Sequence, residues 1–337
     1  MSPVIRVALV AALALSSASC DRKEFAEGFR TATAFQRDAW VQVDPNPVDV
    51  LWVVDTSCSM ADEQAALAIN FPGFTEFFLE TGLPFRLAVT STNVDEEGTE
   101  GLDGAFNSGW LDQDSEDLQE EWVSRALMGI DDGHRDEKGL HAAWTALEEL
   151  GSSANAGFVR DDADLAIIIV SDEPDYSTIG RPDSGDYIDA DGFSLWLDGL
   201  KGDPERSQLS AIVGISPDGL DSPDGCNQDG GGQQGGGALR GNGYLEAAQA
   251  TDGVWQSICS DDWTEMLRLL GLLTAGLQDT FVLSRTAYPA TIQVTVAGLP
   301  VNQWEFDVES NALFFGTSDT IPRPGQVIEI EYEERVD

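Results

Sequence analysis

The sequence predicts an open α/β fold, in which a mostly parallel sheet has helices on both faces, followed by a small C-terminal antiparallel β unit. Short apolar runs alternate with helical patterns from residue 48 to residue 282, as is typical of parallel strands joined by crossover helices. From residue 283 to residue 337 apolar and polar side chains alternate with a period of two, which favours antiparallel strands. Hydrophobic residues make up 42% of the chain, which is enough to form the buried core that such a sheet requires.

The strands and helices expected in the α/β region follow one another along the chain. The short apolar runs bounded by turn residues are expected as strands: 50–54, 85–89, 165–170 and 208–215. The stretches with apolar residues at helical spacing are expected as helices: 63–80, 140–150, 244–250 and 259–277. Strands separated by helices are joined by crossovers, so these strands are expected to lie parallel in one sheet that is buried on both faces.

The C-terminal β unit is expected to contain about four strands. Apolar residues alternate with polar ones around Val294, Phe306, Leu313 and Ile330, and turn residues such as Gly298 separate these segments. A unit of this size buries little apolar surface of its own, so it is expected to pack against the α/β domain.

The first twenty residues are predicted to be a signal peptide. Arg6 gives a positive start, Val7–Leu15 is an apolar run too short to span a bilayer, and small residues precede Cys20. The pattern resembles a bacterial lipoprotein signal, which implies that Cys20 becomes the lipid-modified N-terminus of the mature protein. Ser17 departs from the aliphatic residue usual in such signals, so ordinary cleavage near Ser19 is the alternative.

The chain therefore divides into four predicted segments: a signal peptide (1–20), a leader (21–47), an α/β domain (48–282) and a small β domain (283–337). The prolines of Asp44-Pro45-Asn46-Pro47 mark the boundary between leader and domain. We expect the mature protein to be secreted across the cytoplasmic membrane and to reside in the cell envelope. There a lipid on its N-terminus would hold it, either in the periplasm or at the outer-membrane surface.

The charge of the chain is strongly acidic. It has 60 Asp and Glu against 18 Lys and Arg, a formal net charge of -42 at pH 7. Such a charge repels phosphate backbones and anionic lipids at long range, which argues against nucleic-acid binding and limits membrane contact to the N-terminal lipid. The same field attracts divalent cations and basic partners, although most of these carboxylates are expected on the solvated surface.

The cysteines suit an exported protein with one disulfide. If Cys20 is acylated, Cys58, Cys226 and Cys259 remain. Cys226 lies in a Gly- and Asp-rich loop and Cys259 near an expected helix start, so these two are predicted to pair, which leaves Cys58 as a free small side chain. The chain has only two histidines and no Cys-x-x-Cys, which argues against a zinc site.

Oxygen-bearing side chains follow two of the expected strands. Asp55-Thr56-Ser57-Cys58-Ser59 comes directly after the first strand, and Asp172 comes after the third. In an open α/β sheet, ligands bind at the carboxyl ends of the strands. Carboxylates and hydroxyls are hard ligands that suit Mg²⁺, Ca²⁺ or Mn²⁺. Two carboxylates brought close together without a cation would repel each other, so we expect a divalent cation between Asp55 and Asp172.

These residues resemble the metal-ion-dependent adhesion site of von Willebrand factor type A (vWA) domains. The resemblance covers about residues 48–280 and rests on Asp55-x-Ser57-x-Ser59 and on Asp172. It implies a Rossmann-like fold in which this loop, a threonine and the later aspartate hold a divalent cation directly or through water. It also implies that an acidic side chain of a partner fills the open coordination position, so the expected partner is a protein or other extracellular ligand with an acidic group.

One position departs from the vWA pattern. The threonine should precede the helix expected at 140–150, but Asp136-Glu137-Lys138-Gly139 stands there. Glu137 is the predicted substitute ligand, and Asp136 is the second candidate. A carboxylate in place of a hydroxyl adds negative charge, which strengthens cation binding, favours Ca²⁺ and weakens the attraction to an acidic partner.

Two other functions remain open: a metal-dependent hydrolase of the envelope, and a structural domain whose Ca²⁺ serves only folding. A Ser-His-Asp arrangement would need Ser57 or Ser59 beside His134 or His141. Neither serine lies in a Gly-x-Ser-x-Gly turn. A metal-dependent hydrolase would need two adjacent metal ions or a general base with a raised pKa, and beyond the surplus of carboxylates the sequence indicates neither. We therefore expect binding without enzymatic activity.

Overall fold

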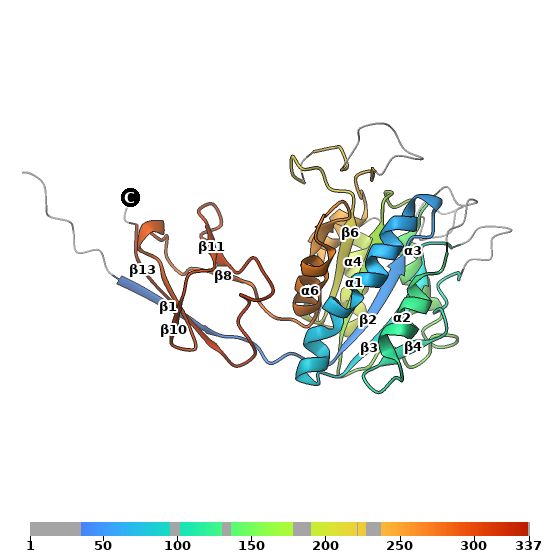
Figure 1. Cartoon of the computed structure of the whole chain (residues 1–337), viewed down its shortest axis with the longest axis horizontal. Helices are drawn as coiled ribbons and strands as arrows, with labels where there is room; N and C mark the ends of the chain where they lie inside the picture. The colour runs from blue at the N-terminus through green and yellow to red at the C-terminus, as the bar shows by residue number, and fades with distance from the viewer. Residues whose placement is uncertain are drawn as a thin grey trace, which may run out of the picture.

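The computed structural model describes residues 35–94, 102–129, 136–177, 190–220, 222–226 and 237–335. The predicted signal peptide, including Cys20, and the first part of the predicted leader lie outside these residues. Figure 1 shows the two units of the described chain, an α/β domain and a C-terminal β unit that lies to one side of it.

Within the described residues, the α/β domain is built on a six-stranded sheet with the strand order β4-β3-β2-β5-β6-β7. The strands are β2 (Val48–Val54), β3 (Phe85–Ser91), β4 (Trp110–Asp112), β5 (Asp164–Ser171), β6 (Ser207–Val213) and β7 (Trp255–Ser257). Only the β3–β4 pair is antiparallel. The predicted mostly parallel α/β sheet is therefore confirmed, with β4 and β7 as short additional edge strands.

Helices cover both faces of this sheet (Figure 1). They are α1 (Ala61–Thr81), α2 (Leu118–Ala126), α3 (Gly139–Trp144), α4 (Ala190–Lys201), α5 (Tyr244–Ala250) and α6 (Trp263–Thr274). Successive side chains of a strand point to opposite faces. Trp52 of β2 accordingly lies in the core formed with α1, α2 and α6, whereas Leu51 and Val53 lie in the core formed with α3, α4 and α5. The helix expected at 140–150 begins as α3 and continues as a π-helical turn at Thr145–Glu149.

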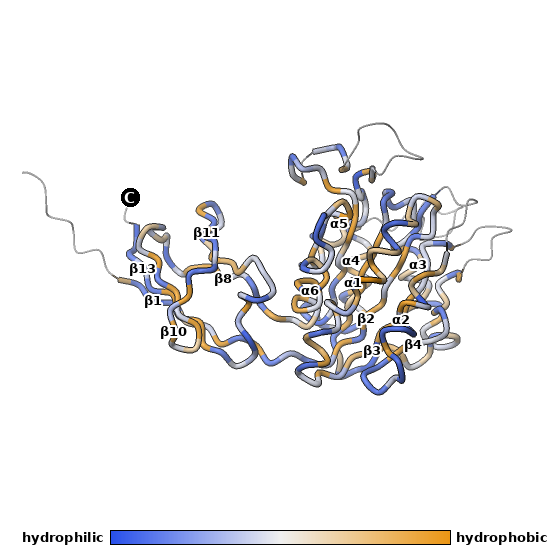
Figure 2. The backbone as a smooth tube through the Cα atoms, in the orientation of Figure 1, coloured by the Kyte–Doolittle hydropathy of each residue, from blue (hydrophilic) through white to orange (hydrophobic). Residues whose placement is uncertain are grey.

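Aromatic packing fixes α1 against the sheet. Trp52 has no exposed surface and contacts Phe74 of α1 and Trp122 of α2, with ring centroids 5.0 Å and 5.4 Å away. Edge-to-face aromatic pairs of this kind contribute about 0.5–1.5 kcal/mol each beyond their buried area. Figure 2 shows the apolar residues concentrated along β2 and its neighbouring helices. Because α1 begins just after the Asp55 loop, this packing also holds that loop in place.

The C-terminal β unit consists of two small antiparallel sheets in the described part of the chain, with strand orders β1-β13-β9-β10 and β11-β12-β8. Their strands are β1 (Phe35–Val41), β8 (Thr280–Val282), β9 (Gln293–Val296), β10 (Leu299–Val301), β11 (Glu305–Asp307), β12 (Ala312–Phe314) and β13 (Val327–Glu333); a short helical turn, η4 (Pro289–Thr291), precedes β9. The alternating pattern of the sequence therefore corresponds to antiparallel strands, as predicted.

The unit also takes in residues that the sequence analysis assigned elsewhere. β1 comes from the segment predicted as a leader, and it pairs with β13 along its whole length, from Phe35 opposite Glu333 to Val41 opposite Val327. β8 comes from the end of the segment assigned to the α/β domain. Pairing with β1 satisfies the backbone groups along one side of β13, which would otherwise be an open sheet edge.

The β unit packs against α6 and α1. Arg268 of α6 forms ion pairs with Glu76 of α1 (2.7 Å) and with Asp319 of the β unit (3.1 Å). Glu265 of α6 accepts hydrogen bonds from the backbone N–H and the hydroxyl of Ser318, at 2.7 and 2.9 Å. The unit thus gains contacts from the larger domain, as its small size led us to expect.

Candidate metal site

The two predicted aspartates lie at the same edge of the sheet. β2 and β5 are neighbours in parallel register, with Val54 opposite Val170. The backbone N–H of Asp55 donates to the carbonyl of Val170 at 2.9 Å, so the pairing continues one residue beyond β2. Asp55 and Asp172 therefore follow adjacent strand ends, as the sequence predicts.

Asp55 is completely buried and is held by hydrogen bonds on both carboxylate oxygens. Its Oδ1 accepts from the backbone N–H of Ser57 at 2.7 Å, and its Oδ2 accepts from the hydroxyl of Ser171 at 2.6 Å. Gln64 of α1 donates from its side chain to the carbonyl of Asp55 at 2.8 Å. The first two contacts, from the loop itself and from β5, fix the orientation of the carboxylate, and the contact from α1 holds the backbone of Asp55.

Ser57, Ser59 and Asp172 converge beside Asp55. The hydroxyls of Ser57 and Ser59 are 3.1 Å apart. Asp172 is 8% exposed, and its Oδ1 has no hydrogen-bond partner. Burial raises the pKa of Asp172, while hydrogen bonds from the side chains of Ser59 and Ser57 act to lower it. The structure therefore brings the four residues of the predicted loop and strand end together.

Glu137 is 1% exposed and joins this cluster from the segment before α3. Its Oε2 accepts a hydrogen bond from the hydroxyl of Thr92, whereas its Oε1 is buried without a partner. The backbone N–H of Tyr176 donates to the carbonyl of Glu137 at 2.6 Å, which ties the segment to the loop after β5. Asp136, the second candidate, is exposed. Of the two, Glu137 is the one whose carboxylate is buried in the cluster.

Three residues around the cluster are not among the predicted ligands. Thr92 follows β3 and brings a hydroxyl to Glu137, although the vWA pattern places the threonine before α3. Glu63, in the first turn of α1, has a buried Oε2 without a partner, and burial raises its pKa. Glu173 adds a further half-buried carboxylate. Position could have signalled Thr92, because it directly follows β3, and Glu173 belongs to the acidic segment that follows β5.

Burial, and after it the charges of neighbouring carboxylates, raises the pKa values of three residues in the cluster. Burial, followed by the charge of Asp172, raises the pKa of Asp55 to about 6. Burial, followed by the charge of Asp55, raises the pKa of Glu137 to about 8. Burial and the charges of Asp55 and Asp172 raise the pKa of Glu173 to about 7. Each raised pKa means that the ionised form of the carboxylate is unfavourable when no cation is bound.

The chemistry of these donors fits a hard divalent cation. Buried carboxylate oxygens that lack a donor are costly, and a cation bound between them would remove that cost. Within the described ranges, three or more His, Cys, Asp or Glu side chains do not gather closely enough to make a metal site by themselves. The hydroxyls of Ser57 and Ser59 would therefore have to complete the coordination shell.

The predicted disulfide between Cys226 and Cys259 is confirmed, with their Cα atoms 6.2 Å apart. It closes a loop next to the site, because Ala238 pairs with Cys226 and the following residue, Leu239, donates its N–H to the carbonyl of Asp172 at 2.8 Å. Cys58 is free and exposed.

The structure describes one of the two histidines, His141. His141 lies on α3 and is 7% exposed, with its ring 6.2 Å from that of Trp144, while its backbone N–H donates to the hydroxyl of Ser177. This agrees with a packing role. His134 lies outside the described residues.

Among the described helices, none has the length and apolar character needed to cross a membrane.

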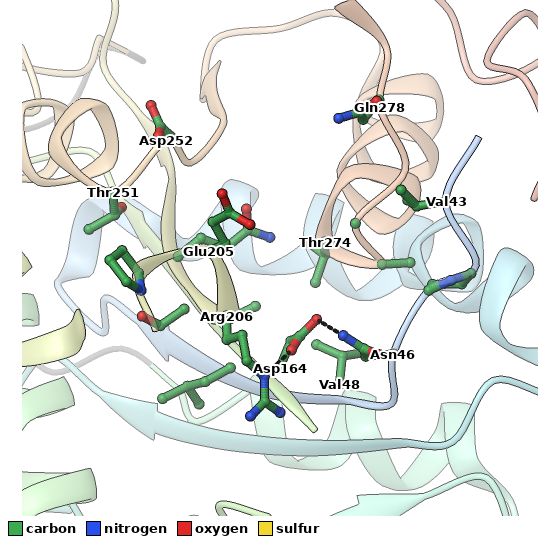
Figure 3. A pocket seen from close by; sticks show the side chains of 18 of the residues that line it. Val43, Asn46, Val48, Asp164, Glu205, Arg206, Thr251, Asp252, Thr274 and Gln278 are labelled. Atoms are coloured by element: carbon green, nitrogen blue, oxygen red, sulfur yellow. Dashed lines mark hydrogen bonds and ion pairs between the residues drawn. The ribbon is translucent and has the colours of Figure 1, made fainter. Parts of the chain in front are cut away.

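A separate pocket of about 590 Å³ lies at the opposite end of the sheet, between the segment before β2 and the beginnings of β5 and β6. Figure 3 shows its polar side chains. Asp164 there forms an ion pair with Arg206 (3.0 Å) and accepts a hydrogen bond from Asn46 (3.0 Å) (Figure 3). Because its central carboxylate is already paired on both oxygens, this pocket does not share the unsatisfied character of the Asp55 cluster.

No protein-family model and no curated protein matches the chain. Among solved structures, the chain is similar to the pilus adhesin SpaC from Lactobacillus rhamnosus GG at 13% identity and a TM-score of 0.44, covering 91% of this chain and 42% of that one. An aerotolerance-related membrane protein from Bacteroides fragilis has 13% identity and a TM-score of 0.36, covering 68% and 99% of the two chains. The pilus adhesin RrgA from Streptococcus pneumoniae has 10% identity and a TM-score of 0.34, covering 90% and 58%. The chain thus spans about two fifths of the length of SpaC.

Proposed function

We propose that this chain is a vWA-type protein of the cell envelope that binds a partner through a divalent cation and performs no chemistry. Asp55, Ser57 and Ser59 would hold the cation from the first loop, Glu137 from the segment before α3, and Asp172 from the end of β5. The bound cation would supply a positive centre to which an oxygen atom of the partner can coordinate. Mg²⁺, Ca²⁺ and Mn²⁺ are all suited to this oxygen set.

One observation carries the proposal: two buried carboxylate oxygens, Asp172 Oδ1 and Glu137 Oε1, lack hydrogen-bond partners. Asp172 also receives hydrogen bonds from the hydroxyls of Ser57 and Ser59. Folded proteins rarely leave such groups unpaired, because each costs about 1–3 kcal/mol or more when charged. A cation between these oxygens would account for their burial and for the raised pKa values around them.

The position of the cluster also supports a binding role. Cys58 and Ser59 are exposed, so one side of the first loop faces solvent. A cation held there would be shielded by the sheet on one side and open to a partner on the other. The hydroxyls of Ser57 and Ser59 contact each other and Asp172, which suits metal ligands better than a nucleophile activated by histidine.

The envelope location rests on two features of the chain. The N-terminal pattern ending at Cys20 resembles a lipoprotein signal. The Cys226–Cys259 disulfide suits an oxidising compartment outside the cytoplasm.

The proposal is tested by titrating the full chain with Mn²⁺, Mg²⁺ and Ca²⁺ in a calorimeter, and by capturing proteins from envelope extracts with and without chelator. We expect one cation per chain for the wild type and for Glu80→Gln, an exposed carboxylate of α1 that serves as the control. Asp55→Ala should bind neither cation nor partner while remaining folded.

Other outcomes separate the alternatives. A chelator that lowers the melting temperature without loss of a captured partner would identify a structural ion. Turnover of an ester or phosphoester panel that disappears in Asp55→Ala would identify a hydrolase. Either result would contradict the proposal.

A further inference from the structure

We propose that a groove at the opposite end of the sheet from the Asp55 cluster binds a linear polyamine, a flexible chain of methylene groups that carries several ammonium groups. The proposal does not depend on the cation site. It rests on two adjoining pockets, on the carboxylates that line them, and on a buried hydroxyl of Thr274 that the protein leaves without a partner.

Two pockets make up the groove. The pocket of about 590 Å³ described above shares Gln208, Asp252 and Gly276 with a second pocket of about 550 Å³, so the two lie side by side. Each volume falls in the range typical of small-molecule sites, roughly 300–1,000 Å³. The second pocket is lined by Trp255 of β7 and by Asp279, which precedes β8. Because two adjoining pockets are longer than either alone, a linear ligand fits them better than a compact one.

Carboxylates outnumber positive groups along this groove. The first pocket is lined by five carboxylate side chains and one guanidinium: Asp44, Asp164, Asp198, Glu205, Asp252 and Arg206. The second pocket adds Asp279. Such a surface attracts cationic ligands and repels anionic ones.

The one guanidinium of the first pocket does not neutralise these charges. Arg206 donates from Nε to Asp164 at 3.0 Å and from Nη2 to the carbonyl of Ala163 at 2.9 Å, so it is paired with a single carboxylate. Asp198, Glu205 and Asp252 form no ion pair with the described residues. Their charges are therefore left for the ammonium groups of a ligand.

Thr274 of α6 gives an observation of a different kind. It lines the first pocket together with Asp164 and Asn46 (Figure 3). Thr274 is 4% exposed, and its hydroxyl oxygen has no hydrogen-bond partner in the described chain, not even the carbonyl of the preceding helical turn, to which helical threonines often donate. Asp164 is paired on both oxygens and shows no missing ligand, but the Thr274 hydroxyl does, since buried polar groups are rarely left unpaired.

An alkylammonium chain matches both the polar and the apolar parts of the groove. Val48, Leu165 and Ala166 line the first pocket and offer apolar surface to methylene groups. An ammonium group carries three N–H donors, so it can pair with a carboxylate and also donate to Thr274. In the second pocket, Trp255 offers an aromatic ring to a further ammonium group. A bare metal ion would leave the apolar surface and the ring unused.

The test is a calorimetric titration of the full chain with spermidine at about 0.15 M salt, where long-range attraction to an acidic chain is largely screened. We expect one spermidine to bind per chain. Hexaamminecobalt(III) is a compact trication that also carries N–H donors, and it should bind at least about tenfold more weakly because it cannot extend along the groove.

Four variants locate the binding. Asp252→Asn should weaken spermidine binding severalfold, and Thr274→Val, which keeps the shape of the side chain and removes the hydroxyl, should weaken it about threefold or more. Glu80→Gln, which changes an exposed carboxylate of α1, should bind spermidine as the wild type does. Asp55→Ala should also bind it unchanged, which separates this groove from the proposed cation site.

Absence of saturable binding, equal affinity for hexaamminecobalt(III), or an equal loss in Glu80→Gln and Asp252→Asn would show that only the net charge attracts polyamines. Unchanged affinity in Thr274→Val, or loss of binding in Asp55→Ala, would show that spermidine does not occupy this groove. Each of these results would overturn the proposal. If Thr274→Val does not fold, Asp252→Asn decides the question, because Asp252 is exposed and its substitution removes no buried contact.

Discussion

Ser171 donates a hydrogen bond of 2.6 Å from its hydroxyl to Oδ2 of Asp55. Ser171, at the end of β5 and next to Asp172, thus holds the carboxylate of Asp55, which follows the neighbouring strand β2. The backbone N–H of Ser57 occupies Oδ1 of the same carboxylate at 2.7 Å. Asp55 is therefore oriented before any cation arrives, which lowers the cost of forming a metal site.

Ser171→Ala should weaken cation binding about 10- to 100-fold, because residues that orient metal ligands contribute by that amount. It should also destabilise the cation-free fold by about 1–2 kcal/mol, since Asp55 loses one of its donors in a buried position. Calorimetric titration with Mn²⁺ measures the first effect and chemical denaturation the second. Ser153→Ala, which changes an exposed serine, is the matched control, and an unchanged affinity in Ser171→Ala would refute the orienting role.

The cation-free protein should become less stable as the pH rises. The folded chain raises the pKa of Glu137 from 4.5 to about 8 and that of Asp55 from 3.8 to about 6, so the folded state binds these protons more tightly than the unfolded state. This contribution to stability is complete below pH 4.5 and is lost as the pH rises toward about 8. Thermal unfolding in chelator across this range should show a falling melting temperature.

The same experiment has an internal control. Saturating Mn²⁺ or Ca²⁺ should abolish or reverse the decline, because the bound cation favours the ionised carboxylates. Glu137→Gln should flatten the pH dependence in chelator, whereas Glu80→Gln should retain it. A melting temperature that rises with pH in chelator would show that the cluster is not strained by its own charge.

Gln42 should stabilise the two segments that connect the β unit to the α/β domain. Its buried side chain donates to the carbonyls of Gln278 (2.8 Å) and Pro322 (3.0 Å) and accepts from the backbone N–H of Gln278 (3.1 Å). Gln42→Ala leaves these backbone groups unpaired and should cost about 3 kcal/mol. Denaturation and limited proteolysis near residue 278 measure the loss, with the exposed Gln119→Ala as control. Equal stability of the two variants would show that the contacts are incidental.

Removal of the disulfide should destabilise the fold and loosen the site. The bond joins residues 33 apart, and closing a loop of that length contributes about 3–4 kcal/mol. Cys226→Ala/Cys259→Ala should therefore lower stability by about that amount, and should weaken Mn²⁺ binding severalfold because Leu239 supports the backbone of Asp172. Cys58→Ala, which changes the exposed free thiol, should leave stability within about 0.5 kcal/mol of the wild type. The account of this loop fails if the two variants are equally stable.

The central sheet could be predicted because its strands are marked locally. Val48–Val54 and Asp164–Ser171 are nearly continuous apolar runs, and such runs fit a sheet that is covered on both faces. β1 could not be predicted in this way. It alternates in exposure, and its partner β13 lies almost three hundred residues further along the chain, so only the tertiary structure reveals the pairing.

The candidate site could be predicted only in part for the same reason. Asp55, Ser57, Ser59 and Asp172 stand at strand ends and were found from position. The choice between Asp136 and Glu137 depends on which side chain is buried, and a short loop does not encode that. Glu63 was missed because an acidic residue in the first turn of a helix is already explained by the helix dipole.

The most direct test of this account is a crystal of the wild-type chain grown with Mn²⁺ and measured for anomalous scattering. We predict one strong anomalous peak within bonding distance of Asp55, Asp172 and Glu137 oxygens or of the waters they hold, beside the hydroxyls of Ser57 and Ser59. The peak should be absent in Asp55→Ala crystals grown in the same way. A wild-type map without a peak at the ends of β2 and β5, at an Mn²⁺ concentration that saturates the protein in solution, would contradict the account.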